Sequence, residues 1–265
     1  MKKKILTIAL LGCIALTLAG FLLFPKIENY FYRIQLDRAN AETMKQIAST
    51  DVINQSISQS IERSAVQPLI PEKAYLVVPS FCQSPFPTEE SWHIHHASCE
   101  EAAVLQAVYY FNGVKAIDLD RVDSTLKDMI AWQEKNFGLH KDIHADSVKM
   151  MMMGYFGYKE DEIKIIRDAT ILDIKQAVAQ GYPVVAPTYG RTLNNPYYKP
   201  PGPEYHMVTV IGYTSDRIIT NDVGTKRGKD FSYPIDIFKK AMDREGGDVI
   251  ILMPHSGVPS DSTKI

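Results

Sequence analysis

An uninterrupted apolar segment opens the chain. Residues Ile5 to Phe24 include no charged side chain and are mostly Leu, Ile, Ala, Gly and Phe. A helix of this length rises about 30 Å, the thickness of the hydrocarbon core of a bilayer. Lysines at positions 2–4 precede it, and such a cluster keeps an N-terminus in the cytoplasm. We therefore expect residues 1–26 to anchor a single-pass cell membrane protein, with its N-terminus cytoplasmic and the following domain extracytoplasmic.

Two other interpretations of this segment stay open. A cleaved signal peptide has a shorter apolar core, about 7–15 residues, followed by small residues at the cleavage site. Here the segment ends in Phe-Leu-Leu-Phe-Pro at positions 21–25, which is a poor cleavage site. Residues 10–13, Leu-Leu-Gly-Cys, loosely resemble a lipoprotein processing box, although the apolar run continues well past Cys13.

The polarity of the chain changes after the anchor and again near its end. Residues 27–72 are rich in Ser, Gln, Asn, Ala and Glu, and their sparse apolar positions have the spacing of one or two weak amphipathic helices. This segment is expected to be a stalk or juxtamembrane helical linker. Residues 73–254 form the folded domain, and residues 255–265 a flexible tail.

Within the domain, helical patterns come first and strand patterns follow. Ser98 and Glu101 have the spacing of a capping box, which opens a helix that ends near Asn112-Gly113. Further helices are expected at 120–135, 145–153 and 171–180, and strands at 75–79, 183–187, 207–213, 217–220 and 249–253. Residues 84–91 and 188–204 are interpreted as loops. This order predicts an α+β fold with an antiparallel sheet.

Composition and charge indicate which kinds of molecule the folded part can bind. Hydrophobic residues make up 45% of the chain and charged residues 23%, as in an ordinary globular protein. The formal net charge is −2, and without the three lysines of the anchor 26 basic residues stand against 31 acidic ones, a net charge of −5. Such a balance argues against nucleic acid as the partner of the folded part.

Cys99 is the first candidate for chemistry. It lies at the first position of the predicted helix, where unpaired backbone amides and the helix dipole favour a thiolate. Glu100 and Glu101 oppose that effect, because a negative charge beside the sulfur favours the neutral thiol. A reactive Cys99 therefore needs a cationic neighbour.

His206 can be that neighbour, because it begins a predicted strand of a hairpin. If the turn centres on Ser215, His206 lies opposite residue 224 and Asp222 is its diagonal neighbour on the same face. The hairpin then presents a base together with a group that orients it. A slip of one residue would replace Asp222 by Asn221. The preceding loop holds several tyrosines, which either cover this site or belong to an ordinary surface loop.

Five stretches in this order resemble a known family. They are residues 78–83 (VPSFCQ), 98–103 (SCEEAA), 181–185 (GYPVV), 206–213 (HMVTVIGY) and 218–222 (IITND). The chain is similar, over Tyr75 to Met253, to the double-glycine leader peptidase-like (bacteriocin-processing) group of papain-fold cysteine peptidases. It departs from the family pattern at Glu100-Glu101, where Gly-Pro is frequent, and at Val223, where Pro is usual.

The resemblance implies a papain-like fold and a thiol hydrolase of peptides or proteins. By it, Cys99 is the nucleophile, His206 the base and Asp222 the residue that orients the histidine. Gln83 supplies an oxyanion-hole donor together with the Cys99 backbone amide. The chemistry requires no metal and no organic cofactor, and the same residues would also serve acyl transfer to an amine.

Two rival interpretations remain. Cys82 and Cys99 are the cysteines outside the anchor, and in an oxidising compartment they could form a disulfide. The domain would then be a non-catalytic module that binds a peptide or a cell-wall component. Zinc is the other alternative, since histidines cluster at positions 93, 95 and 96 and recur at 140 and 144. A zinc hydrolase ranks last.

Overall fold

The computed structural model describes residues 30–48 and 70–255 of the chain. The expected anchor at 1–26, much of the expected stalk and the tail beyond His255 lie outside these residues. Residues 30–48 form a helix. None of the described helices combines the length and the apolar character that crossing a membrane requires.

The domain that follows begins with a short strand and a run of helices, and its other strands come later in the chain among shorter helices. Its helices are α3 (Glu89–His95), α4 (Cys99–Phe111), α5 (Leu119–Phe137), α6 (Ala145–Phe156), the short 3-10 helix η1 (Glu160–Glu162), α7 (Ile171–Ala179), α8 (Gly190–Leu193) and α9 (Ile235–Asp243). Its strands are β1 (Ala74–Tyr75), β2 (Ile163–Ile166), β3 (Val184–Tyr189), β4 (Tyr205–Tyr213), β5 (Arg217–Asn221), β6 (Phe231–Pro234) and β7 (Val249–Leu252).

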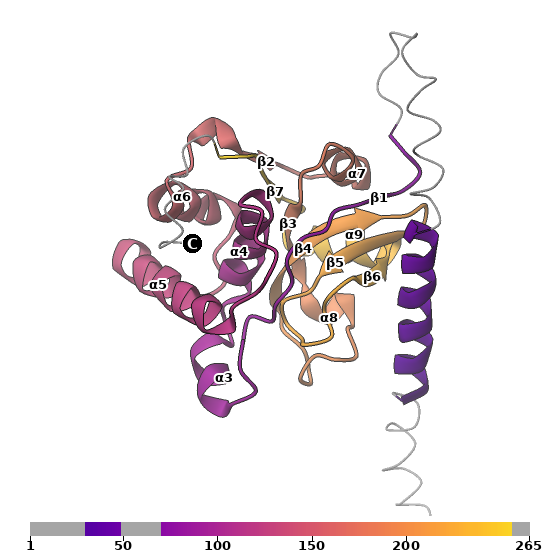
Figure 1. Cartoon of the computed structure of the whole chain (residues 1–265), viewed down its shortest axis with the longest axis horizontal. Coiled ribbons are helices and arrows are strands. Elements are labelled where there is room, and N and C mark those ends of the chain that lie inside the picture. The colour runs from indigo at the N-terminus through magenta and orange to yellow at the C-terminus, as the bar shows by residue number, and fades with distance from the viewer. Residues whose placement is uncertain (1–29, 49–69, 256–265) are drawn as a thin grey trace, which may run out of the picture. The chain divides into compact units, whose positions relative to one another are not determined.

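The strands of the described domain form one sheet in which all pairs are antiparallel (Figure 1). The order is β2-β7-β3-β4-β5-β6, and β1 also pairs with β4. Strand β4 is central, and its residues from His206 to Tyr213 are all buried. Burial on both faces explains why this strand is a nearly continuous apolar run rather than an alternating one. The predicted α+β class with an antiparallel sheet is confirmed.

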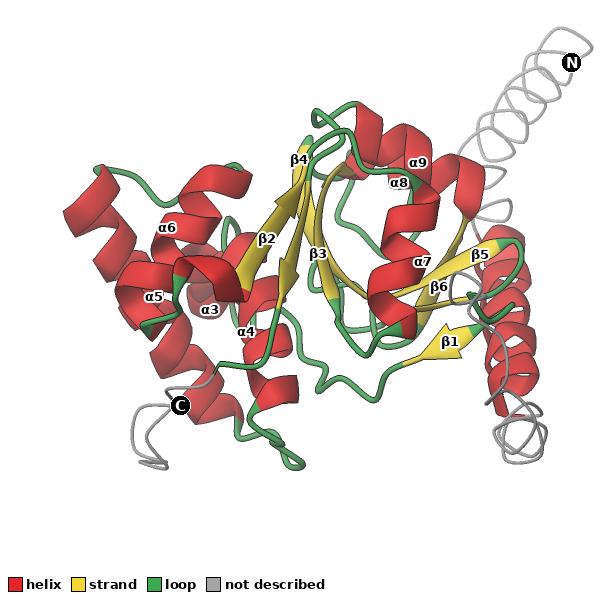
Figure 2. Ribbon diagram, turned by 90° about the horizontal axis from the view of Figure 1, so that it is seen from above, coloured by secondary structure: helices red, strands yellow, loops and turns green. Residues whose placement is uncertain are grey.

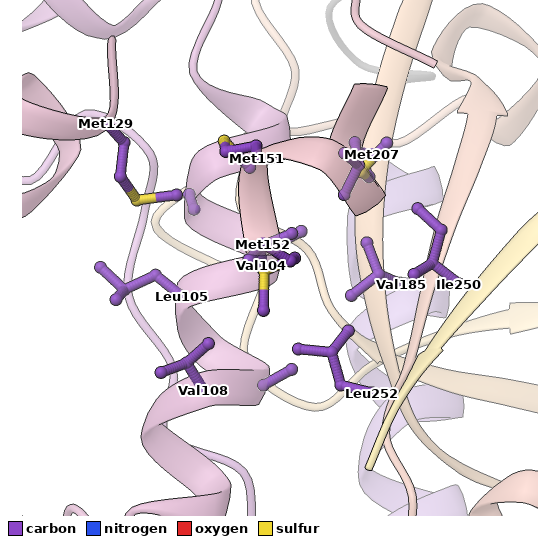
Figure 3. Close-up of a cluster of buried hydrophobic side chains, with 14 of the residues drawn as sticks. Val104, Leu105, Val108, Met129, Met151, Met152, Val185, Met207, Ile250 and Leu252 are labelled. Atoms are coloured by element: carbon purple, nitrogen blue, oxygen red, sulfur yellow. The ribbon is translucent and has the colours of Figure 1, made fainter. Parts of the chain in front are cut away.

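Helices cover the sheet on two sides. In Figure 2, α3 to α6 gather on one side of the strands and α7 to α9 on the other. The side chains between α4, α6 and the sheet form the hydrophobic core of Figure 3, whose labelled members include Val104, Leu105, Met151, Met152, Val185, Met207 and Ile250. Such a core holds the N-terminus of α4 at a defined place against β4.

Helix α4 is buried along most of its length, from Cys99 to Tyr109. Ala102, Ala103 and Ala107 let its backbone approach the sheet closely, and Thr209 of β4 donates a hydrogen bond to the Ala103 carbonyl at 3.0 Å. The prediction that this helix begins at Cys99 and ends near Asn112 is confirmed.

The proposed capping box at the start of α4 is wrong. The Ser98 side chain makes no cap hydrogen bond, and its hydroxyl has no partner in the described part of the chain. Glu101 does not reach back to Ser98 but accepts a hydrogen bond from Gln133 of α5. Both side chains are fully buried, so tertiary packing directs them instead of the local capping geometry.

Helix α6 continues past the predicted end at Gly154. It ends at Phe156, where Gly157 adopts a left-handed φ of 77°. Gly154 lies inside the helix, and a larger residue does not fit there because its Cβ would lie 2.2 Å from Trp132 Cζ2. Close helix packing, and not a helix end, explains this residue.

Some elements do not follow from local pattern. The expected loop at 84–91 ends in the first turn of α3, and the expected loop at 188–204 contains the end of β3 and the short helix α8. Strands β2 and β6 and helix α9 had no predicted counterpart. Helix α9 carries a detectable signal, since its buried residues Phe238, Ala241 and Met242 recur at helical spacing.

Candidate active site

A cavity of about 510 Å³ lies where the N-terminus of α4 meets the start of β4. Cys99, His206 and Gln83 line it together. One wall is α3, which contributes Trp92, and the other is the segment that leads into β4. The Lys199 ammonium from that segment lies 5.2 Å from the centre of the Trp92 ring and so bridges the two walls.

Cys99 occupies the first turn of α4, with only 5% of its surface exposed. Its sulfur accepts a hydrogen bond from the backbone N–H of Met207, the residue after His206. This contact shows that the sulfur lies directly against the start of β4. The thiol itself donates to Glu100 Oε2 at 3.0 Å.

The surroundings of the sulfur favour the neutral thiol. Burial raises the pKa of Cys99 well above its ordinary value, and the carboxyl groups of Glu100 and Glu101 raise it further. The Met207 N–H acts in the opposite direction. Among the described residues, no hydrogen bond joins Cys99 to His206.

His206 and Asp222 meet as the hairpin register predicted. Strands β4 and β5 pair Thr209 with Asn221 and Val210 with Thr220, which is the register assumed for the predicted hairpin. Extended beyond Thr209, this register makes Asp222 the diagonal neighbour of His206. A bulge near Ile211 shifts the register by one residue only on the turn side of these pairs. His206 Nε2 lies 2.9 Å from Asp222 Oδ1.

Neighbouring residues leave His206 Nδ1 available and its ring well packed. With Nε2 bound to Asp222, the structure shows no partner for Nδ1 among the residues it describes. Gly224 lies beside the ring, where a Cβ would come within 2.9 Å of His206 Cε1. Asn221 points elsewhere and donates to the Val78 carbonyl at 3.1 Å, so the alternative register is absent.

The Asp222 carboxylate is the centre of a buried polar network. Besides His206, the backbone N–H of Gly224 donates to Oδ1 at 2.9 Å. Oδ2 accepts from Asn195 Nδ2 at 3.1 Å, from the Tyr198 hydroxyl at 2.6 Å and from the Tyr233 hydroxyl. Burial alone would raise the pKa of Asp222, but His206 and the two hydroxyls outweigh it and lower the pKa to about 2. Asp222 is therefore ionised at any physiological pH.

Asn195 and Tyr233 were missed as site residues, and Tyr198 was predicted only as one of the loop tyrosines that either cover the site or belong to a surface loop. Asn195 and Tyr198 come from the segment between α8 and β4, and Tyr233 comes from β6. Burial and the Asp222 charge raise the pKa of both tyrosines well above its ordinary value, so both remain hydrogen-bond donors. The only signal in the sequence was the richness in tyrosine of the loop before His206, where Tyr198 indeed lines the cavity.

Gln83 lines the cavity, but its side-chain amide is already engaged. Nε2 donates to the backbone carbonyls of His95 at 2.9 Å and His96 at 3.0 Å. The opposite orientation of the amide would place its oxygen against two carbonyl oxygens, so the assignment is determined by the neighbours. Both N–H groups of Gln83 thus face the end of α3, and one must leave its carbonyl before it can donate to an oxyanion.

The two cysteines are separate free thiols. Cys82 is partly exposed and Cys99 is buried, and no disulfide joins them. Burial raises the pKa of the Cys82 thiol. The expected alternative, a structural Cys82–Cys99 disulfide, is therefore not the arrangement found.

The histidines proposed for zinc do not converge. His95 is buried and binds Asp123 at 2.8 Å, while His140 on the surface binds Glu134 at 3.1 Å. His96 lines the cavity. Within residues 30–48 and 70–255, no three His, Cys, Asp or Glu side chains are grouped to hold a metal ion.

Comparison with known proteins covers most of this domain. The model of the Peptidase_C39-like family matches residues 75–246. A putative C39-like peptidase from Bacillus anthracis aligns with a TM-score of 0.49 and 17% identity, over 70% of this chain and 100% of that chain. A fragment of prointerpain A from Prevotella intermedia aligns with a TM-score of 0.45 and 12% identity, over 83% and 85% of the two chains. No curated protein matches the sequence.

Proposed function

Because the chain belongs to the Peptidase_C39-like family, we propose that it is a cysteine peptidase that uses Cys99, His206 and Asp222 to cleave a peptide or amide bond. The observation that carries the proposal is the shared cavity. It brings the thiol at the start of α4 to the histidine at the start of β4, and a buried carboxylate holds that histidine. The family match supports a cysteine peptidase-like hydrolase, and the roles of the individual residues are our assignment.

The geometry supports a two-step mechanism. The Cys99 proton moves to His206 Nδ1, and the resulting thiolate attacks the carbonyl carbon of the substrate. Asp222, bound to Nε2, stabilises the imidazolium that forms. His206 then gives the proton to the leaving amine, and the acyl group remains on Cys99. Water attacks this thioester with His206 as base, which releases the acid and restores the thiol.

The oxyanion of the tetrahedral intermediate needs donors. The Cys99 backbone N–H lies in the first turn of α4, where amides have no partner within the helix. It is the first donor of the proposed oxyanion hole. Gln83 is the second, provided that substrate binding draws one of its N–H groups away from α3.

We also propose that residues 1–26 anchor the protein in the membrane and that the domain is extracytoplasmic. This part of the proposal is supported by the apolar segment and the lysines that precede it. Protease added to intact cells expressing the full chain should digest the domain while the membrane stays sealed. Protection of the domain in intact cells would contradict the orientation. The similarity to double-glycine leader peptidases extends the proposal to peptide substrates but names no particular peptide.

Thiol reactivity tests the proposed triad directly. The full chain, purified in detergent without reductant, is treated with limiting iodoacetamide, and peptide mass spectrometry follows Cys99 and Cys82 separately. We expect Cys99 labelling to slow in His206→Ala and to be unchanged in the matched control His140→Ala, which lies outside the cavity. Equal rates in both variants would overturn the triad. A native Cys82–Cys99 disulfide would favour a non-catalytic binding module instead.

A further inference from the structure

The Cys99 thiol faces a carboxyl group that the mechanism does not use. Its hydrogen bond goes to Glu100 Oε2 at 3.0 Å, and the other oxygen of Glu100 accepts from the Ile143 backbone N–H at 2.8 Å. Glu100 has no exposed surface. Contacts at both oxygens hold this carboxyl group at the sulfur, and burial strengthens its electrostatic effect there.

Other ionisable groups surround this pair on several elements. Glu101 lies next along α4, and its Oε2 finds no hydrogen-bond partner in the described part of the chain. Asp142 faces Glu100 from the loop before α6, and Tyr205 faces both Cys99 and Glu100 from the start of β4. Beyond Tyr205, His144 contacts the Tyr205 ring edge-on and Glu245 lies within electrostatic reach of Tyr205. Glu101 and Asp142 are acidic, and their charges disfavour a further negative charge on Glu100.

We propose that Glu100 is a positioning residue that holds Cys99 as a protonated thiol, and that protonation of Glu100 frees the sulfur for His206. The inference rests on the proposed function, because it assumes that Cys99 is the nucleophile. In the carboxylate form, Glu100 both accepts the thiol hydrogen bond and repels a thiolate. In the carboxylic acid form it repels no longer and can itself donate a hydrogen bond to the thiolate.

The sign of the pH effect follows from this burial. Burial raises the pKa of Glu100 to about 7, with Asp142 adding to it, while the hydrogen bonds from Cys99 and Ile143 act in the opposite direction. Below pH 7 Glu100 is mostly neutral, so Cys99 can transfer its proton to His206. Above pH 7 each further pH unit leaves about tenfold less neutral Glu100, so the labelling rate of the wild type falls about tenfold per unit relative to a variant that cannot ionise at this position.

The rate of Cys99 alkylation against pH is the deciding measurement. The full chain in detergent is labelled with iodoacetamide between pH 5.5 and 8.5, as wild type and as Glu100→Gln, Glu101→Gln and His206→Ala. Glutamine resembles the neutral acid in shape and cannot ionise. We expect equal rates for wild type and Glu100→Gln at pH 6 and about a tenfold faster Glu100→Gln at pH 8. The profile of Glu101→Gln should keep the break of the wild type near pH 7.

Each outcome decides the inference separately from the triad. A Glu100→Gln variant that labels more slowly than wild type at pH 8 would show that Glu100 accepts the thiol proton as a base, which overturns the proposal. A ratio that does not change with pH would also overturn it. Should Glu100→Gln fail to fold, a wild-type profile without a break near pH 7 refutes the proposal, and a break supports it. The triad fails only if His206→Ala leaves the labelling rate unchanged.

Discussion

Substitution of Asp222 by asparagine tests how the buried network stabilises the domain. Both carboxylate oxygens accept hydrogen bonds, Oδ1 from His206 and Gly224 and Oδ2 from Asn195, Tyr198 and Tyr233. An asparagine side chain has one oxygen and one NH₂ group. In either orientation its NH₂ faces donors, so at least one of them is left buried without an acceptor.

The magnitude follows from the pKa of Asp222. A pKa of about 2 in the folded protein against an ordinary 3.8 corresponds to about 2 kcal/mol of folding free energy. Because the folded pKa is the lower one, this stability is present above pH 4 and is lost as the pH falls through 4 toward 2. The donors left without an acceptor in Asp222→Asn increase this loss of stability by about 1–3 kcal/mol. The side chain at position 222 is fully buried, so water cannot replace the missing acceptor.

Thermal unfolding of the full chain in detergent, followed by the fluorescence of Trp92 and Trp132, measures the effect. We expect Asp222→Asn to lower the midpoint clearly at pH 7 and by a smaller amount at pH 3, where about half of the contribution linked to the pKa of Asp222 remains and the unpaired donors still destabilise the variant. The matched control is Asp236→Asn on the surface of α9, which should change neither. The reasoning would be refuted by a variant as stable as wild type at pH 7, or by a deficit that is the same at both pH values.

Three further predictions concern single features of the structure. Tyr198→Phe keeps the ring against His206 but removes one donor to Asp222, so it should cost about 1.5–3 kcal/mol of stability at pH 7 and raise the pH midpoint of acid unfolding, measured by circular dichroism. An unchanged midpoint would show that the hydroxyl is dispensable. Gly154→Ala should destabilise the domain by about 1–3 kcal/mol in urea unfolding, because its Cβ would overlap the Trp132 ring, and an unchanged midpoint would contradict that packing. Peptide hydrolysis should persist in EDTA, whereas loss of activity with rescue by zinc would point to a metal site.

Part of the site could be predicted because it depends on local pattern. The helical spacing after Cys99 and the Asn112-Gly113 end define α4 without knowledge of its neighbours. A short turn defines the register of a hairpin, and alternation of side chains then places Asp222 and His206 on one face. From these two inferences the sequence predicts that Cys99 begins a helix and that His206 and Asp222 lie on one face of a hairpin.

The surroundings of these residues were decided by the tertiary structure. Asn195, Tyr198 and Tyr233 reach Asp222 from two separate segments, and nothing in their local sequence shows that they converge. Glu101 turns to Gln133 of α5 instead of capping α4.

The same limit applies to the groups around the nucleophile. The sequence by itself places Glu100 and Glu101 beside Cys99 and shows that their charges disfavour a thiolate. It does not show that Glu100 is fully buried and that its carboxyl group accepts a hydrogen bond from the Cys99 thiol. Nor does it show that Gln83 donates both amide hydrogens to backbone carbonyls at the end of α3. Periodicity reports which face of an element is buried, whereas the partner of a buried polar group depends on which other segments supply a donor or acceptor there. For that reason the sequence determined the order and register of the central elements, and only the packing of distant segments decided the protonation and orientation of the groups that they carry.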